Sequence, residues 1–81
     1  MPFGVSAEIL AEIKRQYPRG ARVELVRMKD PQAPPVGTRG TVIGVDAIGS
    51  VMVRWDNGSG LSVLYGEDAC IIVEEGGRNG R

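Results

Sequence analysis

Short apolar-rich stretches, each ended by glycine, proline or a polar turn, fill the chain between residues 22 and 73, and apolar and polar residues alternate from the first of them, at Arg22–Leu25. A period of two is typical of β-strands that bury one face. The pattern predicts five short strands. They are placed at Arg22–Met28, Arg39–Val45, Val51–Trp55, Leu61–Leu64 and Cys70–Val73. The chain is therefore expected to be mainly β.

The connections between these strands predict how they are arranged. Asp30–Gly37 contains three prolines, which cannot join the middle of a sheet, so a long stiff loop is expected there. Gly49-Ser50 supplies one turn, Asp56–Ser59 carries the Asn-Gly pair of a tight hairpin, and Tyr65–Asp68 is expected to be another tight turn. Five strands with these connections predict a five-stranded SH3-like β-barrel.

A short N-terminal α-helix is expected before the barrel, at Ser6–Gln16. Ser6 is a good N-cap, and Lys14 and Arg15 lie near the negative end of the helix dipole. The apolar residues of this segment fall on one face, which consists of Ile9, Leu10, Ile13 and Tyr17. We expect this face to cover one end or side of the barrel, and a dimer contact is the alternative.

The chain of 81 residues is long enough for one hydrophobic core. The residues expected in it are Val23, Leu25, Val42, Val51, Val53, Trp55, Leu61, Val63, Ile71 and Val73. A single domain is expected at residues 6–73, with an N-terminal arm at residues 1–5. Residues 74–81, rich in glycine and charge, are expected to form a disordered tail.

Several kinds of chemistry have no residues to support them. Cys70 is the only cysteine and there is no histidine, so a disulfide within the chain, structural zinc and the usual nucleophile–histidine pairs are excluded. We interpret Cys70 as a small buried residue. Gly37, Gly40 and Gly44 lack the spacing of a phosphate-binding loop and are interpreted as turn and bulge glycines. We expect no enzymatic activity, no cofactor and no metal.

No apolar run approaches the roughly 20 residues of a membrane span, and Met1–Val5 lacks the features of a secretory signal. We therefore expect a soluble cytoplasmic protein that does not contact membranes.

Charge is balanced over the whole chain but unevenly distributed along it. Between residues 14 and 39 there is an excess of five positive charges, and between residues 40 and 75 an excess of five negative charges. The molecule is therefore expected to be electrically polar unless folding interleaves the two halves.

The first functional hypothesis is a protein-interaction domain that is a monomer or a weak homodimer. In it, Trp55, Tyr65 and the loop at residues 31–36 form a groove for a partner. The candidate ligand-binding residues are Trp55, Tyr65, Arg54, Arg39, Pro34 and Pro35. Trp55 shares its strand parity with Val51 and Val53, which favours a place in the core; at the surface it would form an aromatic platform with Tyr65.

The alternative hypothesis is a nucleic-acid-binding barrel. In it, basic residues around the first strand contact phosphates while an aromatic side chain stacks on a base. The candidate residues are Arg19, Arg22, Arg27, Lys29 and Arg39. The neutral net charge and the four aromatic residues favour a protein partner over nucleic acid.

Four motifs together resemble one known family. They are Tyr17-Pro18-Arg19-Gly20 with Arg22-Val23-Glu24-Leu25, Asp30-Pro31-Gln32-Ala33-Pro34-Pro35, Gly37-Thr38-Arg39-Gly40-Thr41-Val42, and Val53-Arg54-Trp55-Asp56-Asn57-Gly58-Ser59. The chain from Ile9 to Val73 is similar to the bacterial and phage-associated domain of unknown function family 4314. The resemblance implies a small uncharacterised domain of bacterial and mobile-element proteins, with no activity to carry over.

Overall fold

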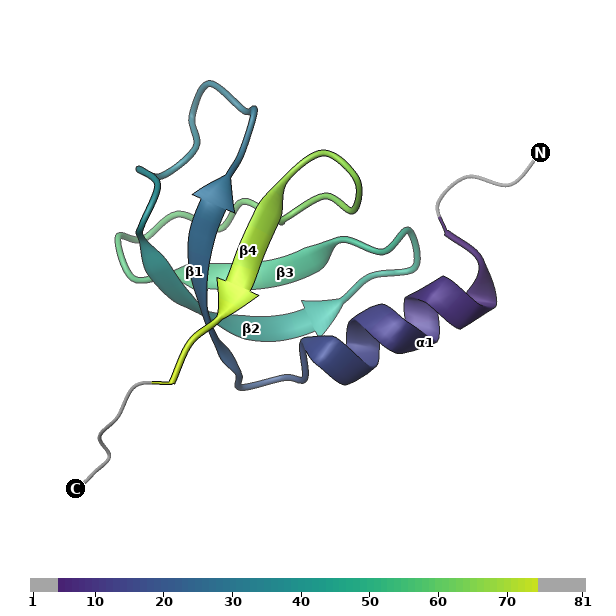
Figure 1. The fold of residues 1–81 in the computed structure, drawn as a ribbon. Coiled ribbons are helices and arrows are strands. Elements are labelled where there is room, and N and C mark those ends of the chain that lie inside the picture. Colours follow the sequence, from purple (N-terminus) through teal and green to yellow (C-terminus); the bar gives the residue numbers. More distant parts are fainter. Residues whose placement is uncertain (1–4, 75–81) are drawn as a thin grey trace.

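In the computed structural model, which describes residues 5–74, one helix is followed by four strands (Figure 1). The elements are α1 at Ala7–Gln16, β1 at Arg22–Arg27, β2 at Arg39–Val45, β3 at Val51–Trp55 and β4 at Ala69–Ile72. The strands form one antiparallel sheet in the order β3-β2-β1-β4. The predicted mainly β architecture with an N-terminal helix is confirmed.

The helix begins and ends where its sequence predicts. The Ser6 hydroxyl accepts a hydrogen bond from the backbone N–H of Ile9 at 3.1 Å, which caps the first turn. At the other end, the N–H of Tyr17 donates to the carbonyl of Ile13, and Pro18 follows. Lys14 in the last turn complements the helix dipole.

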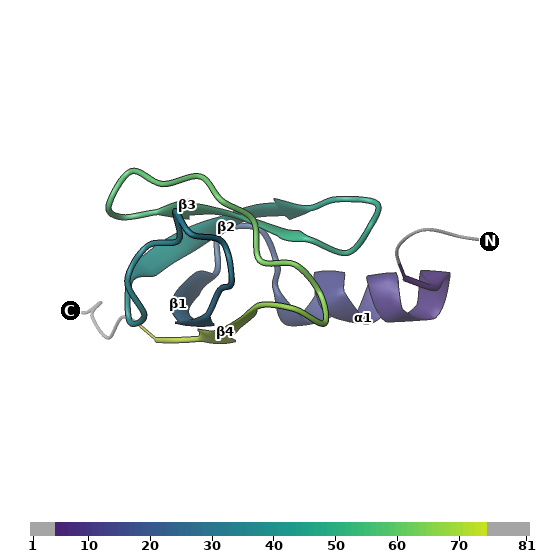
Figure 2. The same ribbon diagram turned by 90° about the horizontal axis from the view of Figure 1, so that it is seen from above.

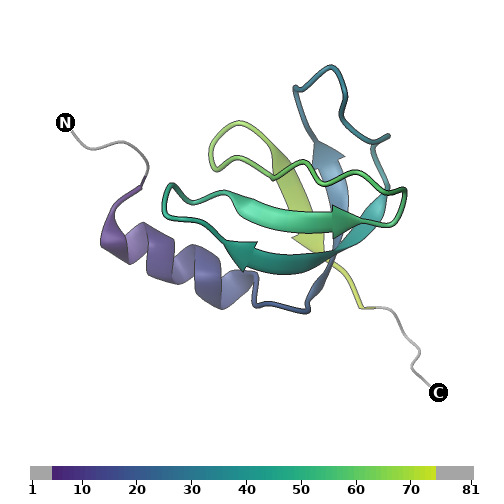
Figure 3. The same ribbon diagram turned by 180° about the vertical axis from the view of Figure 1, so that it is seen from behind.

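The apolar face of α1 packs against one end of the sheet. Ile13 is buried, Leu10 and Tyr17 are half-buried, and Ile9 is exposed. The turn between β2 and β3 runs alongside the helix (Figure 3), and a Cβ placed on Gly49 in this turn would lie within 3.4 Å of Ile13. The predicted cover of one end of the sheet is therefore present. The predicted arm at residues 1–5 lies outside the described residues except for Val5, which packs against the core.

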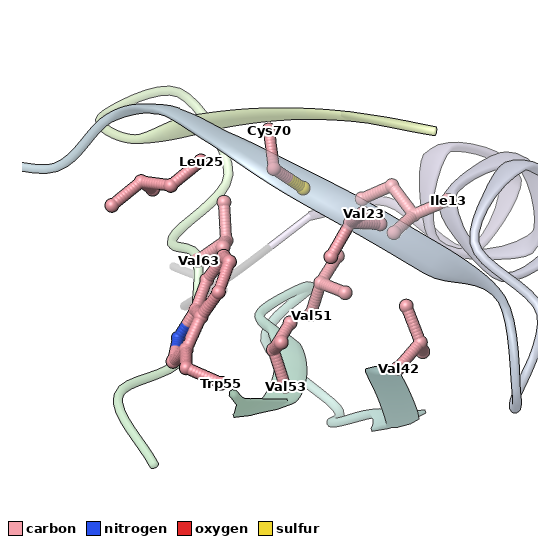
Figure 4. Packing of buried hydrophobic residues seen from close by; sticks show 9 residues of the cluster. All are labelled: Ile13, Val23, Leu25, Val42, Val51, Val53, Trp55, Val63 and Cys70. Atoms are coloured by element: carbon pink, nitrogen blue, oxygen red, sulfur yellow. The ribbon is translucent and has the colours of Figure 1, made fainter. Parts of the chain in front are cut away.

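The sheet folds over on itself, so that β2 and β3 lie above β1 and β4 in Figure 2. The core fills the space between these two layers. Its buried apolar residues are Ile13, Val23, Leu25, Val42, Val51, Val53, Trp55, Val63 and Cys70. Figure 4 shows their side chains converging from the helix, the four strands and the segment around residue 63. Cys70 is buried among them, as predicted.

The last strand faces the core through Cys70 and not through Ile71 or Val73. Leu25 of β1 is opposite Cys70, which places Cys70 in the core and turns Ile71 outward, where it is 49% exposed. Val73 lies beyond β4 and is half-buried. The prediction that Ile71 and Val73 are core residues was wrong. An uninterrupted apolar run carries no alternation, so pairing with β1 alone decides which residues face inward.

The predicted fourth strand is not a strand in the structure. Within residues 61–64 only Val63 pairs, through two backbone hydrogen bonds with Val51 at 2.9 and 2.8 Å. The carbonyl of Leu61 accepts instead from the indole N–H of Trp55, and the N–H of Leu64 donates to the carboxylate of Asp68. Because these side chains occupy the backbone groups on either side of Val63, the sheet has four strands and does not close. The predicted five-stranded closed barrel is not confirmed, and Leu61 is only half-buried.

Two glycines illustrate different constraints on the fold. Gly58 has a φ of +96° in the hairpin after β3, where its N–H donates to the carbonyl of Trp55 at 2.9 Å, so this turn uses the predicted Asn-Gly pair. Gly40 lies within β2, where a Cβ would be 2.6 Å from Cγ1 of Val53 and 2.7 Å from the carbonyl oxygen of Arg54. Gly40 is therefore required by close packing of β3 on β2, and its interpretation as a turn or bulge glycine was wrong.

Candidate binding groove

A groove of about 330 Å³ lies on the side of the sheet that does not close. We call it the helix groove, because one wall is the C-terminal half of α1. Its floor is apolar and consists of the core residues Val51, Val63 and Cys70. The other walls are the beginning of β4 and the turn before it. The residues that line these walls include Gln16, Tyr17, Arg27, Tyr65, Asp68 and Ala69.

Two tyrosines flank the helix groove. The hydroxyl of Tyr17, at the end of α1, donates to the backbone carbonyl of Cys70 at 3.2 Å. Burial raises the pKa of Tyr17, and the neighbouring Cys70 raises it further, so the phenol remains a donor to higher pH than an exposed tyrosine does. Tyr65, in the turn before β4, is 54% exposed. One wall therefore holds a fixed aromatic ring and the other an accessible one.

The two charged side chains that line the helix groove, Arg27 and Asp68, have structural partners. Nε of Arg27 donates to the carbonyl of Glu67 at 3.2 Å. The carboxylate of Asp68 accepts from the N–H of Leu64 at 3.0 Å and from the N–H of Lys29 at 3.2 Å. Asp68 therefore ties the turn at residues 64–68 to the loop after β1, and this fixes the position of Tyr65.

The thiol on the floor of the groove is poorly suited to nucleophilic chemistry. Burial raises the pKa of Cys70 to about 11, so the thiol is protonated at neutral pH, and only the thiolate is nucleophilic. Among residues 5–74, no group of three cysteine, aspartate or glutamate side chains is placed to hold a metal ion. The features of the helix groove are an apolar floor, aromatic walls and a polar edge, which suit binding.

The predicted ligand-binding residues do not form one site. Trp55 is 1% exposed and its indole N–H is held by Leu61, so Trp55 is a core residue and forms no surface platform with Tyr65. Pro34 is buried, whereas Pro35 is exposed. Of Trp55, Tyr65, Pro34 and Pro35, only Tyr65 lines the helix groove.

Arg54 and Arg39, the two arginines among the predicted ligand-binding residues, lie on the outer face of the sheet. Arg54 is opposite Thr41 on β2 and alternates with the inward-facing Val53 and Trp55. Nε of Arg39 donates to the carboxylate of Glu24 at 3.1 Å. Tyr65 opens onto the core side of the sheet, so the structure separates it from these arginines.

The basic residues of the nucleic-acid hypothesis are also divided. Arg22 forms two hydrogen bonds with the carboxylate of Asp56, at 2.9 and 2.6 Å, and this pair lowers the pKa of Asp56. The Arg22–Asp56 contact therefore joins the basic half of the chain to the acidic half, whereas Arg39 and Glu24 both lie in the basic half. Arg27 lines the helix groove. Lys29 lines a second hollow of about 350 Å³, and Arg19 is exposed after the helix.

Sequence reasoning missed Gln16, Tyr17, Asp68 and Ala69 as lining residues. Tyr17 was assigned to the apolar face of the helix. In the structure it also contacts β4, which is more than 50 residues away in the chain. One signal was present in the sequence, because tyrosine is enriched at interfaces. The chain has two tyrosines, and both line the helix groove.

These features define a mainly β domain with an N-terminal helix, an open four-stranded antiparallel sheet and one apolar groove beside the helix. The model of the family described as Domain of unknown function (DUF4314) matches residues 6–73, so the chain belongs to this family and the resemblance is confirmed. No curated protein and no solved structure matches the chain. No helix within residues 5–74 has the length and apolar character needed to cross a membrane.

Proposed function

We propose that this protein is an interaction module and that it binds a protein partner in the helix groove. The observation that carries the proposal is the exposed ring of Tyr65 beside an apolar floor of core residues. Tyrosine is enriched in protein interfaces because its ring is apolar and its hydroxyl is polar. Concave sites with apolar floors and a few polar groups are the usual places for recognition. This site replaces the groove predicted from Trp55 and the loop at residues 31–36.

We also infer that the domain is a variant of the SH3-like barrel with one side left open. The sheet order is β3-β2-β1-β4, and the Val51–Val63 bridge places the segment around Val63 beside β3. All five predicted strand segments are then neighbours in one series, which supports this inference. Such barrels are mainly binding modules, although a fold alone names no ligand. A bacterial or mobile-element origin and a cytoplasmic location remain predictions.

A protein partner is favoured over nucleic acid on electrostatic grounds. The ion pairs of Arg22 with Asp56 and of Arg39 with Glu24 place carboxylates beside two of the five candidate phosphate contacts. An amide NMR titration of the labelled protein with mixed-sequence single- and double-stranded oligonucleotides at low and moderate salt tests this directly. We expect no salt-dependent shifts. Shifts clustered around Arg22, Arg27 and Arg39 that weaken with salt would establish the nucleic-acid alternative.

The groove itself is tested with peptides selected from a random phage-displayed library on the immobilised protein. We expect Tyr65→Ala to weaken binding of a selected peptide about tenfold, because interface tyrosines are frequent hot spots. Val36→Ala is the matched control, since Val36 is 71% exposed on the loop of the originally predicted groove. Binding lost in Val36→Ala and kept in Tyr65→Ala would move the site to that loop.

A further inference from the structure

We propose that the partner binds as an extended, basic segment that adds a strand to β4. The proposal rests on the proposed function, because it assigns the partner's chemistry at the helix groove. Strand addition to a sheet edge is a general mode of peptide recognition, in which backbone hydrogen bonds provide affinity and pockets for alternate side chains provide specificity.

The backbone of β4 offers hydrogen-bonding groups on the edge that faces away from β1. β4 ends the sheet, so this outer edge pairs with no strand of residues 5–74. The N–H of Val73 donates to the carbonyl of Arg22, and in an antiparallel ladder such bonded pairs alternate with pairs whose backbone groups point outward. The residues that point outward are therefore Cys70 and Ile72.

The hydrogen bond from Tyr17 supports this assignment independently. The Tyr17 hydroxyl reaches the Cys70 carbonyl from the helix side, which shows that the groups of Cys70 face away from β1. A bound strand would thus exchange two hydrogen bonds with Ile72 and would accept one from the N–H of Cys70. Because Ala69 and Cys70 line the helix groove, a strand bonded to Ile72 continues into the groove between Tyr17 and Tyr65.

Apart from its short length of four residues and the Tyr17 hydroxyl on the Cys70 carbonyl, β4 lacks the features that normally protect an edge strand. Edge strands are usually protected from pairing by lysine, proline, inward charges or a cover. The sequence Ala-Cys-Ile-Ile contains none of these residues, and Ile71 and Ile72 are 49% and 46% exposed. An apolar, β-branched edge of this kind matches a partner with apolar residues at alternate positions.

The charges around β4 favour a basic partner. Glu67 and Asp68 precede the strand and Glu74 follows it, whereas Arg27 is the one cation among the described residues that line the helix groove. An extended segment with lysine or arginine at its ends complements these carboxylates. In the antiparallel register that pairs Cys70 with Ile72 of a second copy of this chain, Asp68 would lie opposite Glu74, so that register is unfavourable for self-pairing.

The test uses Ile72→Pro, which removes an N–H that points away from β1 and so leaves the ladder of the sheet intact. Ile72→Val is the matched control, because it keeps the N–H and a β-branched side chain. Peptides are selected from a random phage-displayed library on the full chain, and the most enriched one is synthesised and titrated against each protein. We expect alternating apolar residues with lysine or arginine at the ends. Ile72→Pro should weaken binding about tenfold and Ile72→Val less than about threefold.

Amide hydrogen exchange of the unsubstituted protein keeps the proposal testable even if Ile72→Pro does not fold. Bound peptide should slow exchange at Cys70 and Ile72, and unchanged exchange there would overturn strand addition. A peptide that is lost in Tyr65→Ala but binds Ile72→Pro fully would leave the groove function standing and refute the strand. A peptide whose affinity is the same for Tyr65→Ala, Ile72→Pro and the unsubstituted protein would refute both proposals. A selection that enriches no peptide would refute them as well. A wild-type dimer that Ile72→Pro converts to a monomer would assign the edge to a second copy instead.

Discussion

The indole nitrogen of Trp55 donates a hydrogen bond to the carbonyl oxygen of Leu61 at 2.8 Å. This contact joins the end of β3 to the segment that returns past it. The same segment continues through Val63, on the floor of the helix groove, to Tyr65 on its wall. Trp55, a core residue that does not line the helix groove, therefore positions one side of the candidate binding site.

Replacing Trp55 by alanine is expected to destabilise the protein by about 3 kcal/mol or more, because the substitution leaves a large cavity in the core. Trp55→Phe should cost less, since it keeps most of the apolar volume and loses chiefly the hydrogen bond to Leu61. Urea unfolding followed by circular dichroism measures both changes. An unchanged midpoint for Trp55→Ala would place this residue outside the core.

Gly40→Ala is expected to destabilise the protein by about 1–3 kcal/mol, because the new methyl group would overlap Val53 and the backbone of Arg54. Gly60→Ala is the control, since a Cβ at Gly60 would meet nothing within 4 Å. The comparison of melting temperatures tests the packing of β3 on β2. Equal melting temperatures would mean that the two strands separate to admit the methyl group at little cost.

The pKa of the Asp56 carboxyl is expected to lie below its ordinary value of 3.8, because its hydrogen bonds from Arg22 favour the charged form. The stability contributed by a lowered pKa is present above the ordinary value and is lost as pH falls through the lowered one. NMR titration of the Asp56 carboxyl carbon measures this pKa. Arg22→Ser should raise it towards 3.8, whereas Arg54→Ser, which removes a cation from the same face, should leave it nearly unchanged.

Cys70 is expected to react slowly with iodoacetamide at pH 8 in the folded protein and rapidly in urea, because burial raises its pKa to about 11. A raised pKa contributes stability below the ordinary value, and that stability is lost as pH rises towards the raised one. Unfolding free energy should therefore fall between about pH 9 and pH 11, and less steeply in Cys70→Ala. The raised pKa of Tyr17 acts in the same direction, so Tyr17→Phe is measured alongside. Equal labelling rates with and without urea would contradict the buried thiol.

The elements predicted with correct bounds are those whose signals are local. The N-cap at Ser6 and the proline after Tyr17 define the helix within a few residues of chain. Arg39–Val45 and Val51–Trp55 are rich in β-branched and aromatic residues and are bounded by turn residues, and both strands have the predicted bounds. Local signals suffice here because caps, turns and strand composition are properties of neighbouring residues.

The elements predicted wrongly depend on partners distant in the chain. Leu61–Leu64 has the composition of a strand, but the side chains of Trp55 and Asp68 occupy the backbone groups on either side of Val63. Such competition is invisible to a pattern of apolar residues. The candidate site shows the same limit, because its walls come from residues 16–17, 27 and 65–70.

The amino-acid sequence by itself determined the mainly β class, the capped helix, the inward faces of β1, β2 and β3, and membership of the family. It did so because alternation, capping and motif residues are properties of short stretches. Tertiary structure alone decided that Ile71 faces outward, that the sheet stays open, and that Tyr17 and Tyr65 flank one groove. The physical reason is that strand register and hydrogen-bond competition depend on which distant backbone groups meet, and an uninterrupted apolar run such as Ala69–Val73 carries no information about that choice.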